Sequence, residues 1–467
     1  MTRKLLLLSV GVALLLLGIL TVVHYSRQSP TPRVLQIAQA VSVAATPQRN
    51  GDPERGRQQL LSGSYVSCGI PARVFERVFT TPDAIKLAER RSEDQDLPYF
   101  SNRIQGPDNT ELITSNCLSC HAAPLFGEII VGLGNEFLDF TRQDNLVERA
   151  GLLVRGEAET RAWEKLSERM SAVANYTRAA TVGVNVANNL TFALMSHVDP
   201  ETLLWSDSPL IEPPDSEPLP VSVPPWWRME KKNALFYQGQ GQGDHARIMI
   251  LAALLCADGI DSVKAADQYA PDISAYIASL RAPEYPLPVN RELAATGQQV
   301  FEQTCVRCHG SYEGTGSYPN LLVPLDVVGT DAALAQQAID YQRFDEWFAA
   351  SWYAQDTRIV PANGYMAPPL DGVWATGPFL HNGSVPTIDL LLNSAKRPTH
   401  WRHSVEREYN EHEVGWSWEI PGAAEIEAGA AYIYDTTRYG YGNGGHLFGD
   451  HLTDAERAAV LEYIKTL

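Results

Sequence analysis

Two pentapeptides combine cysteine and histidine at a spacing that can hold a porphyrin. They are Cys117–His121 (CLSCH) and Cys305–His309 (CVRCH). Two thiols three residues apart on a turn can reach the two vinyl groups of one haem, and the adjacent histidine can ligate the iron from one side. A C-x-x-C pair alone also suits zinc or a redox site. Two copies followed by histidine favour two covalently bound c-type haems, with the candidate residues Cys117, Cys120, His121, Cys305, Cys308 and His309.

The chemistry of such a protein depends on the other side of each iron. Iron with two protein ligands transfers electrons, whereas an open position can bind peroxide or dioxygen. For the second haem, His381, Met366 and His446 are candidates, and the glycines around His446 would let backbone approach a porphyrin. For the first haem no ligand is comparably convincing. His245 is the nearest polar candidate by character, although a histidine that begins a helix and contacts nearby carbonyls fits it equally well. The sequence thus hints at one closed and one open haem.

Helical patterns surround both motifs. An entry helix over residues 292–304 leads into the second motif, and a capping box at Thr453–Glu456 starts a final helix with an apolar face. These two helices are expected to pack together and to bury one porphyrin. Residues 157–170 and 246–255 are further helix candidates. No strand-rich pattern competes with them, so we expect a mainly α fold with two cytochrome c-type haem domains behind an N-terminal transmembrane anchor.

The length of 467 residues predicts more than one domain. We expect a signal anchor at residues 1–23, a linker at 24–50, an N-terminal haem domain at 51–285 and a C-terminal cytochrome c domain at 286–467. The formal charge of −18 argues against nucleic acid and anionic lipid as partners. It suits a basic redox donor, but it is equally typical of an acidic soluble surface.

The N-terminus indicates export. Two basic residues precede an apolar run from Leu5 to Val23, which is nearly long enough to span a bilayer. We expect an uncleaved anchor on the periplasmic side of a bacterial inner membrane, with a cleaved signal as the alternative. An exported protein can pair Cys68 with Cys256. Because Cys256 lies in an apolar run, a buried free thiol is the expected state, with no disulfide.

The motifs resemble those of the bacterial di-haem cytochrome c peroxidase superfamily. The segment Trp374–Thr387 (WATGPFLHNGSVPT) after the second haem motif carries this resemblance. Three further segments, Trp226–Tyr237, Pro369–Thr376 and Gly445–Gly449, look most like the branch with the rubber-oxygenase type of di-haem cytochrome. The resemblance extends over most of the chain from about residue 55.

This resemblance implies roles for individual residues. The haem at His121 would react with substrate and the haem at His309 would supply electrons. Asn393–Ala395 stand where common peroxidases have a methionine ligand, so His446 is the best candidate for that place, followed by His381 and Met366. Carbonyls of Thr376 and Pro378 fall where peroxidases bind calcium, which makes calcium a candidate cofactor.

We therefore expect an oxidoreductase that reduces peroxide at the N-terminal haem with electrons relayed by the C-terminal haem. A small cytochrome or cupredoxin would be the donor. His245 and Arg247 are the candidate catalytic residues that move protons there. One alternative is a dioxygenase that acts on an unsaturated lipid or polymer. Another is an electron-transfer protein with two haems and no substrate of its own.

Overall fold

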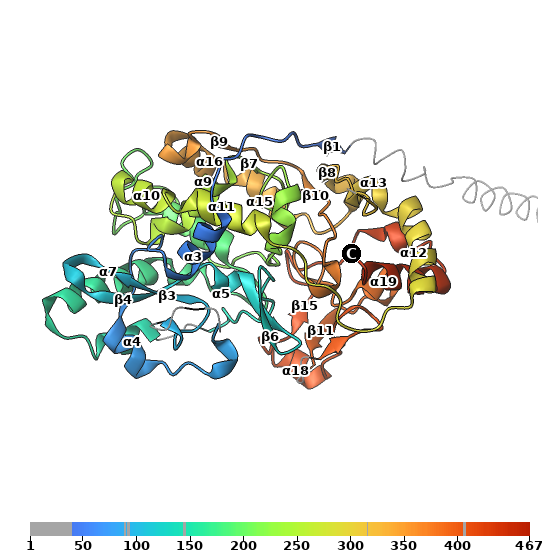
Figure 1. The fold of residues 1–467 in the computed structure, drawn as a ribbon, viewed down its shortest axis with the longest axis horizontal. Helices are drawn as coiled ribbons and strands as arrows, with labels where there is room; N and C mark the ends of the chain where they lie inside the picture. Colours follow the sequence, from blue (N-terminus) through green and yellow to red (C-terminus); the bar gives the residue numbers. More distant parts are fainter. Residues whose placement is uncertain (1–39, 88–89, 91–93, 143–145, 315, 405–407) are drawn as a thin grey trace, which may run out of the picture. The chain divides into compact units, whose positions relative to one another are not determined.

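The computed structural model describes residues 40–87, 90, 94–142, 146–314, 316–404 and 408–467. Residues 42–467 form one unit in which helices alternate with small sheets (Figure 1). Helices account for 41% of the protein and strands for 14%. The prediction of a mainly α fold is therefore wrong. Its strands are two to five residues long, which is too short for an alternating pattern to stand out in the sequence.

The expected transmembrane anchor at residues 1–23 lies outside the described residues. Within the described part of the chain, no helix is long and apolar enough to cross a membrane. The anchor in the predicted fold is thus not shown.

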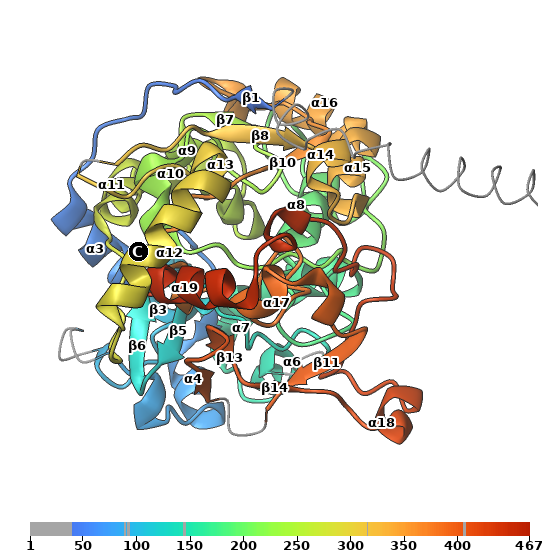
Figure 2. The same ribbon diagram turned by 90° about the vertical axis from the view of Figure 1, so that its right-hand side faces the viewer.

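One pair of crossing helices stands beside the second haem motif. Helices α12 (Arg291–Thr304) and α19 (Asp454–Ile464) pack against each other (Figure 2). They meet at Gly297, where a Cβ atom would lie 1.8 Å from the carbonyl oxygen of Ala459. The hydroxyl of Thr453 accepts a hydrogen bond from the backbone N–H of Glu456, which is the predicted capping box. The predicted packing of the entry helix on the final helix is confirmed.

A second pair of helices repeats this arrangement, with one helix before and one after the first haem motif in the sequence. Helices α3 (Pro53–Ser62) and α11 (Ala270–Ser279) lie side by side (Figure 1). At Gly56 a Cβ atom would lie 1.9 Å from the carbonyl oxygen of Asp272. The side chain of Asp272 also accepts hydrogen bonds from the guanidinium of Arg55. The unit therefore contains two glycine-mediated helix crossings, and in each the first helix precedes one C-x-x-C-H turn in the sequence and the second helix follows it.

A sheet separates α3 from the first haem motif in the sequence. Strands β2 (Ile70–Pro71), β4 (Glu111–Ser115) and β3 (Ser101–Gln105) pair antiparallel in that order. The amide of Asn102 donates hydrogen bonds to the carbonyls of Leu60 and Gly63, which ties the sheet to the end of α3. A hairpin of β5 (Ala122–Leu125) and β6 (Glu128–Val131) follows the first motif directly.

The remaining elements are short, apart from α7. The two haem-motif turns are α5 (Leu118–His121) and α13 (Val306–His309). The other helices are α4 (Ala72–Val78), α6 (Leu146–Gly151), α7 (Gly156–Val173), α8 (Ala187–Ser196), α9 (His245–Met249), α10 (Ile260–Asp267), α14 (Leu325–Val328), α15 (Ala333–Asp340), α16 (Gln342–Ala350), α17 (Ile388–Leu391) and α18 (Ala423–Glu427). The other strands are β1 (Val41–Ser42), β7 (Gly241–Gly243), β8 (Leu321–Pro324), β9 (Thr357–Ile359), β10 (Gly364–Met366), β11 (His400–His403), β12 (Tyr409–Asn410), β13 (Gly415–Trp416), β14 (Trp418–Glu419) and β15 (Tyr434–Asp435).

The two halves of the sequence interlock. Strand β7 pairs with β9, which lies more than a hundred residues later. Aromatic side chains of residues 341–353 share one core with Leu118 and Trp226, and the indole N–H of Trp347 donates a hydrogen bond to the carbonyl of Val198 at 2.6 Å. Side chains from the second half thus complete the core around the first haem motif. The domain boundary at residue 285 stays a prediction.

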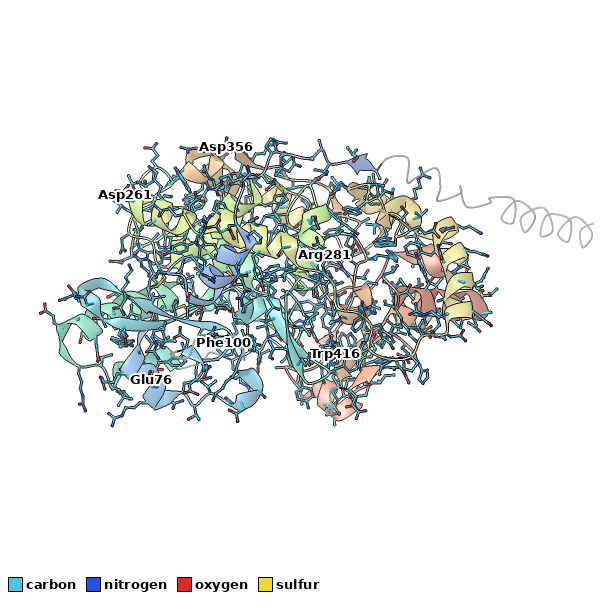
Figure 3. The ribbon with its side chains drawn as sticks, in the orientation of Figure 1. Glu76, Phe100, Asp261, Arg281, Asp356 and Trp416 are labelled. Atoms are coloured by element: carbon cyan, nitrogen blue, oxygen red, sulfur yellow. A yellow bond between two sulfur atoms is a disulfide. The ribbon has the colours of Figure 1, made fainter. Side chains whose placement is uncertain are left out.

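Exposed carboxylates occur on several elements of the unit. Glu76, Asp261 and Asp356 lie on different elements and are exposed (Figure 3). Buried carboxylates are instead paired: Asp267 accepts two hydrogen bonds from Arg49. Charge that is spread over a surface favours solubility and biases the choice of partners without defining one site.

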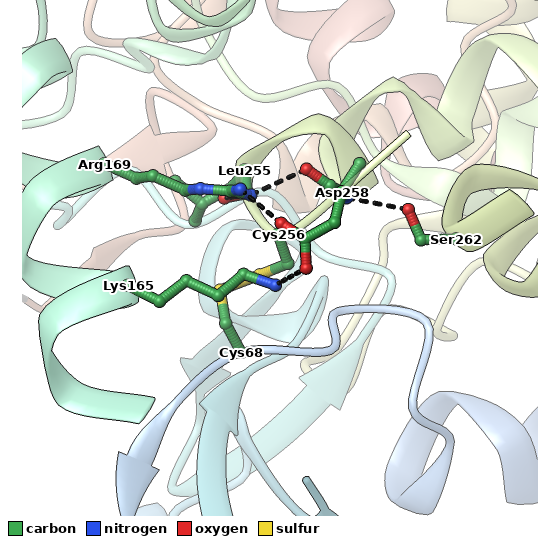
Figure 4. The surroundings of a disulfide bond; sticks show 8 residues. Cys68, Lys165, Arg169, Leu255, Cys256, Asp258 and Ser262 are labelled. Carbon is green, nitrogen blue, oxygen red and sulfur yellow. Dashed lines mark hydrogen bonds and ion pairs between the residues drawn. A yellow bond between two sulfur atoms is a disulfide. The ribbon is translucent and has the colours of Figure 1, made fainter. Parts of the chain in front are cut away.

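Cys68 and Cys256 form a disulfide (Figure 4). The expectation of a free thiol is therefore wrong. Cys256 is buried among apolar side chains as expected, but the fold brings Cys68 beside it although the two residues are 188 positions apart. Next to the bridge, Asp258 binds Lys165 and Arg169 of α7. A disulfide between such distant residues depends on the tertiary structure. It cannot be predicted from the local sequence around Cys256.

Removing this disulfide should lower stability. We expect Cys68→Ser combined with Cys256→Ser to reduce the free energy of unfolding by about 2–5 kcal/mol, because the open chain regains conformational entropy in the unfolded state. Chemical denaturation of the haem-loaded protein measures this. Lys165→Met, which alters only a neighbouring ion pair, should cost less than about 1 kcal/mol. Equal stability of the double variant and the wild type would contradict the expectation.

Candidate haem sites

Both C-x-x-C-H turns contain the same backbone hydrogen bond. The N–H of His121 donates to the carbonyl of Cys117 at 3.1 Å, and the N–H of His309 donates to the carbonyl of Cys305 at 3.0 Å. One helical turn therefore places the first cysteine and the histidine on the same face. The four thiols are half-buried and form no disulfide. They remain available for thioether bonds.

The described residues do not support the zinc alternative. No three or more histidine, cysteine, aspartate or glutamate side chains in the described part of the chain converge to hold a metal ion. Burial raises the pKa of Cys117 to about 11 and that of Cys305 to about 12. Zinc ligands are thiolates held in a converging set, so this arrangement fits thioether attachment better.

The inserted sheet positions the first turn. The side-chain carbonyl of Asn116 accepts a hydrogen bond from the N–H of Leu118 at 2.9 Å, and its amide donates to the carbonyl of Tyr99 and the side chain of Asn102. The backbone N–H of Cys117 donates to the hydroxyl of Tyr65 at 3.4 Å. Buried side-chain hydrogen bonds of this kind fix a single conformation. The first motif is thus held in place by residues that sequence reasoning did not single out.

His121 is supported by the indole ring of Trp226. Its ring stacks on the indole of Trp226, with 4.6 Å between ring centres and an interplanar angle of 19°. Burial lowers the pKa of His121 to about 4, and the approaching carbonyl of Pro224 opposes part of this effect. The imidazole is therefore neutral at physiological pH, as an iron ligand must be. Among the described residues, no second histidine ring faces it.

His309 is held by a proline carbonyl as well. Its Nδ1 donates a hydrogen bond to the carbonyl oxygen of Pro368 at 2.8 Å. Burial lowers its pKa, and the Pro368 carbonyl acts in the opposite direction. A hydrogen bond at one ring nitrogen fixes the orientation of a histidine ligand and directs the other nitrogen at the metal. This side chain therefore fits the role of a haem ligand.

His446 lies opposite His309. Their ring centres are 6.2 Å apart with an interplanar angle of 53°. Two imidazole nitrogens, each about 2 Å from one metal, would put the ring centres roughly 6 Å apart. Burial lowers the pKa of His446 to about 3, so the ring is neutral, and its Nδ1 is buried without a hydrogen-bond partner. The pair has the separation that one iron between two histidines requires.

The backbone around His446 is unusual. His446 has a φ of 47°, in the left-handed region, and Gly445 has a φ of 72°. A Cβ atom at Gly445 would lie 2.1 Å from the backbone carbon of Gly329. The guanidinium of Arg397 holds the loop by donating to the carbonyls of Asn443 and Gly445 at 2.6 and 2.8 Å. Such strain in a well-fixed loop is typical of functional sites.

The other two candidates for this place contact different groups. The ring of His381 stacks on Tyr365 with 4.0 Å between centres. Burial lowers the pKa of His381 to about 3, and its Nε2 has no partner. The sulfur of Met366 packs against Gly239. Of the three candidate ligands, His446 is the one whose ring lies opposite that of His309.

The two candidate catalytic residues, Arg247 and His245, differ in the contacts that their side chains make. The guanidinium of Arg247 lies 4.2 Å over the ring of Trp352 and donates to the carbonyl of Gln355 at 3.0 Å. These contacts anchor Arg247 in the fold. The ring of His245 is buried, its Nε2 has no hydrogen-bond partner, and burial lowers its pKa to about 4. The proton-transfer role of both residues stays a prediction.

The calcium prediction gains no support from the surroundings of Thr376. Its hydroxyl donates to the carbonyl of Val373 and accepts a hydrogen bond from the guanidinium of Arg228 at 3.3 Å. The guanidinium of Arg228 places a positive charge beside Thr376, which disfavours a second cation near its carbonyl. Calcium at Thr376 and Pro378 stays a prediction.

Residues 364–402 match the family model described as RoxA-like, cytochrome c-like. This match supports a cytochrome c family. The matched segment contains Pro368, whose carbonyl holds His309, and His381. A cytochrome c-like domain implies covalently bound haem c and is consistent with an oxidoreductase. The turns, the neutral histidines and the free thiols described above fit that cofactor.

Two relatives from Sinorhizobium fredii are similar to parts of this chain. The uncharacterized protein y4iJ is 34% identical, and the match covers 40% of this chain and 41% of y4iJ. The uncharacterized protein y4iM is 29% identical, and the match covers 37% of this chain and 45% of y4iM. The chain thus spans less than half the length of these relatives.

Proposed function

We propose that the protein is an exported di-haem c-type cytochrome that reduces peroxide at the site of His121 with electrons relayed through the site of His309. The observation that carries this proposal is the difference between the two histidines. His309 has His446 opposite it at 6.2 Å, whereas His121 stacks on Trp226 and faces no second histidine among the described residues. A closed site suits electron transfer and an open one suits substrate.

Haem bound at these turns would supply the redox chemistry. The chain supplies the rest. His121 and His309 are kept neutral by burial, and the carbonyl of Pro368 orients His309. Trp226 holds the plane of His121, and Arg397 fixes the loop of His446. His245, buried and neutral with a free Nε2, is the proposed proton carrier for peroxide reduction.

The disulfide supports export. Disulfides persist in oxidising compartments such as the bacterial periplasm and are rare in the cytosol. The bridge between Cys68 and Cys256 is buried inside the unit that carries both haem motifs. Covalent attachment of haem c takes place outside the cytoplasm as well. A periplasmic location with a small, basic redox protein as the electron donor fits the net charge of −18.

A second candidate function is favoured by the RoxA-like match. The sequence resembles the rubber-oxygenase type of di-haem cytochrome, and the matched segment follows the second haem motif. The core beside the first motif is apolar and aromatic, with Leu118, Leu194 and Trp226 among its residues. In that case the His121 site would serve dioxygen-dependent oxidation of an unsaturated lipid or polymer.

Two matched variants test the proposal. Cys117→Ser with Cys120→Ser removes the first attachment site, and Cys305→Ser with Cys308→Ser removes the second. We expect each pair to reduce donor-dependent peroxide turnover at least a hundredfold. Peroxide should still change the absorption spectrum of the second variant but not that of the first. Peroxide turnover that survives in the first variant would contradict the assignment.

An oxygen electrode separates the two candidate functions. Oxygen uptake with an unsaturated lipid or polyisoprene, together with peroxide turnover near background, would favour the oxygenase. Peroxide turnover without oxygen uptake would favour the peroxidase. If neither occurs while both haems can be reduced by a donor, the protein transfers electrons only.

A further inference from the structure

One arginine joins the loop of His446 to the core of the second haem site. The guanidinium of Arg397 donates five hydrogen bonds, and all five acceptors are backbone carbonyls. We propose that Arg397 is the positioning residue that keeps His446 in place as a ligand and so closes the second haem site to external ligands. This inference rests on the two-haem function proposed above.

The first set of acceptors belongs to the end of helix α17. The Nε atom of Arg397 donates to the carbonyl of Leu390 at 3.0 Å, and Nη2 donates to the carbonyl of Leu391 at 2.9 Å. The last carbonyls of a helix have no partner within the helix, and an arginine side chain can bind them. These two bonds therefore fix the guanidinium on the C-terminus of α17.

Helix α17 is itself anchored in the core of the second haem site. Ile388 and Leu390 are buried in the same apolar cluster as Phe301 of α12 and Val460 of α19. Helix α17 also lies beside α19 (Figure 2). Helix α12 leads directly into the turn that carries His309. The anchor of the guanidinium thus belongs to the same packed core as that turn.

The second set of acceptors belongs to the loop of His446. The Nη1 atom of Arg397 donates to the carbonyls of Asn443 and Gly445 at 2.6 and 2.8 Å. The Nη2 atom donates to the carbonyl of His446 itself at 3.4 Å. A guanidinium has five N–H groups in a planar fork, so these bonds use all of them. One side chain therefore connects the end of α17 to the loop that presents His446.

The loop of His446 needs such a connection because its own residues hold it weakly. Three of the five residues from 442 to 446 are glycines, and glycine loses more conformational freedom than any other residue when it is fixed. Among the described residues, the Nδ1 of His446 has no hydrogen-bond partner that would hold the ring. The backbone N–H of His446 donates to the carbonyl of Val328 at 2.6 Å. The position of the ring therefore depends on backbone contacts, and Arg397 supplies three of them.

Removal of the guanidinium should weaken the binding of His446 to the second haem. Groups that orient a metal ligand typically change the metal affinity by about 10–100-fold when they are removed. An external ligand such as imidazole competes with His446 for the same coordination position. The affinity of this haem for imidazole should therefore rise by a similar factor.

The test compares Arg397→Met with Lys396→Met in the haem-loaded protein. Lys396 is the exposed neighbour of Arg397, and its loss removes the same charge while the five bonds remain. Arg397→Gln serves as a second variant in case Arg397→Met yields too little folded protein. Attached haems are counted by mass first, so that failure of the two-haem function is recognised separately. Electron paramagnetic resonance and imidazole titration then follow the second haem, with the first haem as an internal reference.

In Arg397→Met, but not in Lys396→Met, we expect a high-spin signal from the second haem and an imidazole affinity at least about tenfold above that of the wild type. Imidazole should then restore the low-spin signal, which an unfolded site would not allow. Arg397→Lys should show the same change, because its donors sit on one atom and do not form a fork.

The proposal is overturned if Arg397→Met and Arg397→Gln both keep the wild-type spectrum and imidazole affinity. A wild-type spectrum in Arg397→Lys would contradict the need for a fork that reaches both segments. If His446→Ala itself leaves the spectrum unchanged while two haems are attached, the assignment of His446 as a ligand fails, and the role of Arg397 fails with it.

Discussion

Replacing His446 by alanine should convert one of the two haems from a low-spin, six-coordinate form to a high-spin form. The ring of His446 lies 6.2 Å from that of His309, which is the separation expected of two histidines on one iron. Loss of one axial ligand opens a coordination position and weakens the ligand field. Electron paramagnetic resonance of the ferric variant should therefore show loss of one low-spin signal and gain of a second high-spin signal.

Two histidine variants control for this change. His451→Ala alters an exposed histidine five residues further along the same segment and should leave the spectrum unchanged. His381→Ala removes a buried ring that stacks on Tyr365, so it should lower stability without changing the spin states. A spectrum of His446→Ala that matches the wild type would show that His446 is not an iron ligand. A change in His381→Ala instead would transfer the role to that residue.

Alanine at Gly297 should destabilise the protein by at least about 3 kcal/mol, because no space exists for a methyl group at the helix crossing. The added carbon would lie 1.8 Å from the carbonyl oxygen of Ala459, and that oxygen belongs to the backbone of α19. The two helices must therefore separate. Gly56→Ala should have a similar effect, since its carbon would lie 1.9 Å from the carbonyl oxygen of Asp272 in α11.

Thermal and chemical denaturation of the holoprotein measure both effects. Gly422→Ala is the matched control, because its φ is −66° and the nearest atom to an added carbon is 3.4 Å away in a flexible side chain. Because Gly422 is the N-cap of the short helix α18, the substitution should change the free energy of unfolding by no more than about 1 kcal/mol. If Gly297→Ala or Gly56→Ala were as stable as this control, the corresponding crossing would not be tightly packed.

Features that depend on neighbouring residues could be predicted from the sequence. The haem-motif turns, the helix over residues 291–304 and the capping box at Thr453 are set by spacing and local hydrogen bonds. The candidate His446 was found because glycines beside a histidine allow an unusual backbone, and its φ of 47° agrees with that interpretation. The type of cofactor site could therefore be predicted from the sequence without knowledge of the fold.

Features that depend on distant residues could not be predicted. The disulfide joins positions 188 apart, and the apolar run around Cys256 is compatible with either a bridge or a free thiol. The crossing of α3 with α11 could not be predicted, because the sheet of β2, β3 and β4 lies between Gly56 and Cys117 in the sequence. No helix of the described residues therefore leads directly into the first haem motif. A glycine followed four residues later by a large apolar residue, Leu60 after Gly56 and Phe301 after Gly297, is the signal that could have found it.

The electron paramagnetic resonance spectrum of the ferric protein, combined with a count of attached haems by mass, is the most direct test of two unequal haem sites. The account predicts two haems per chain, one low-spin with two histidine ligands and one high-spin at His121. Fewer than two attached haems per chain would contradict the claim that both C-x-x-C-H turns bind haem. Two low-spin haems in every redox state would contradict the open site and leave electron transfer alone.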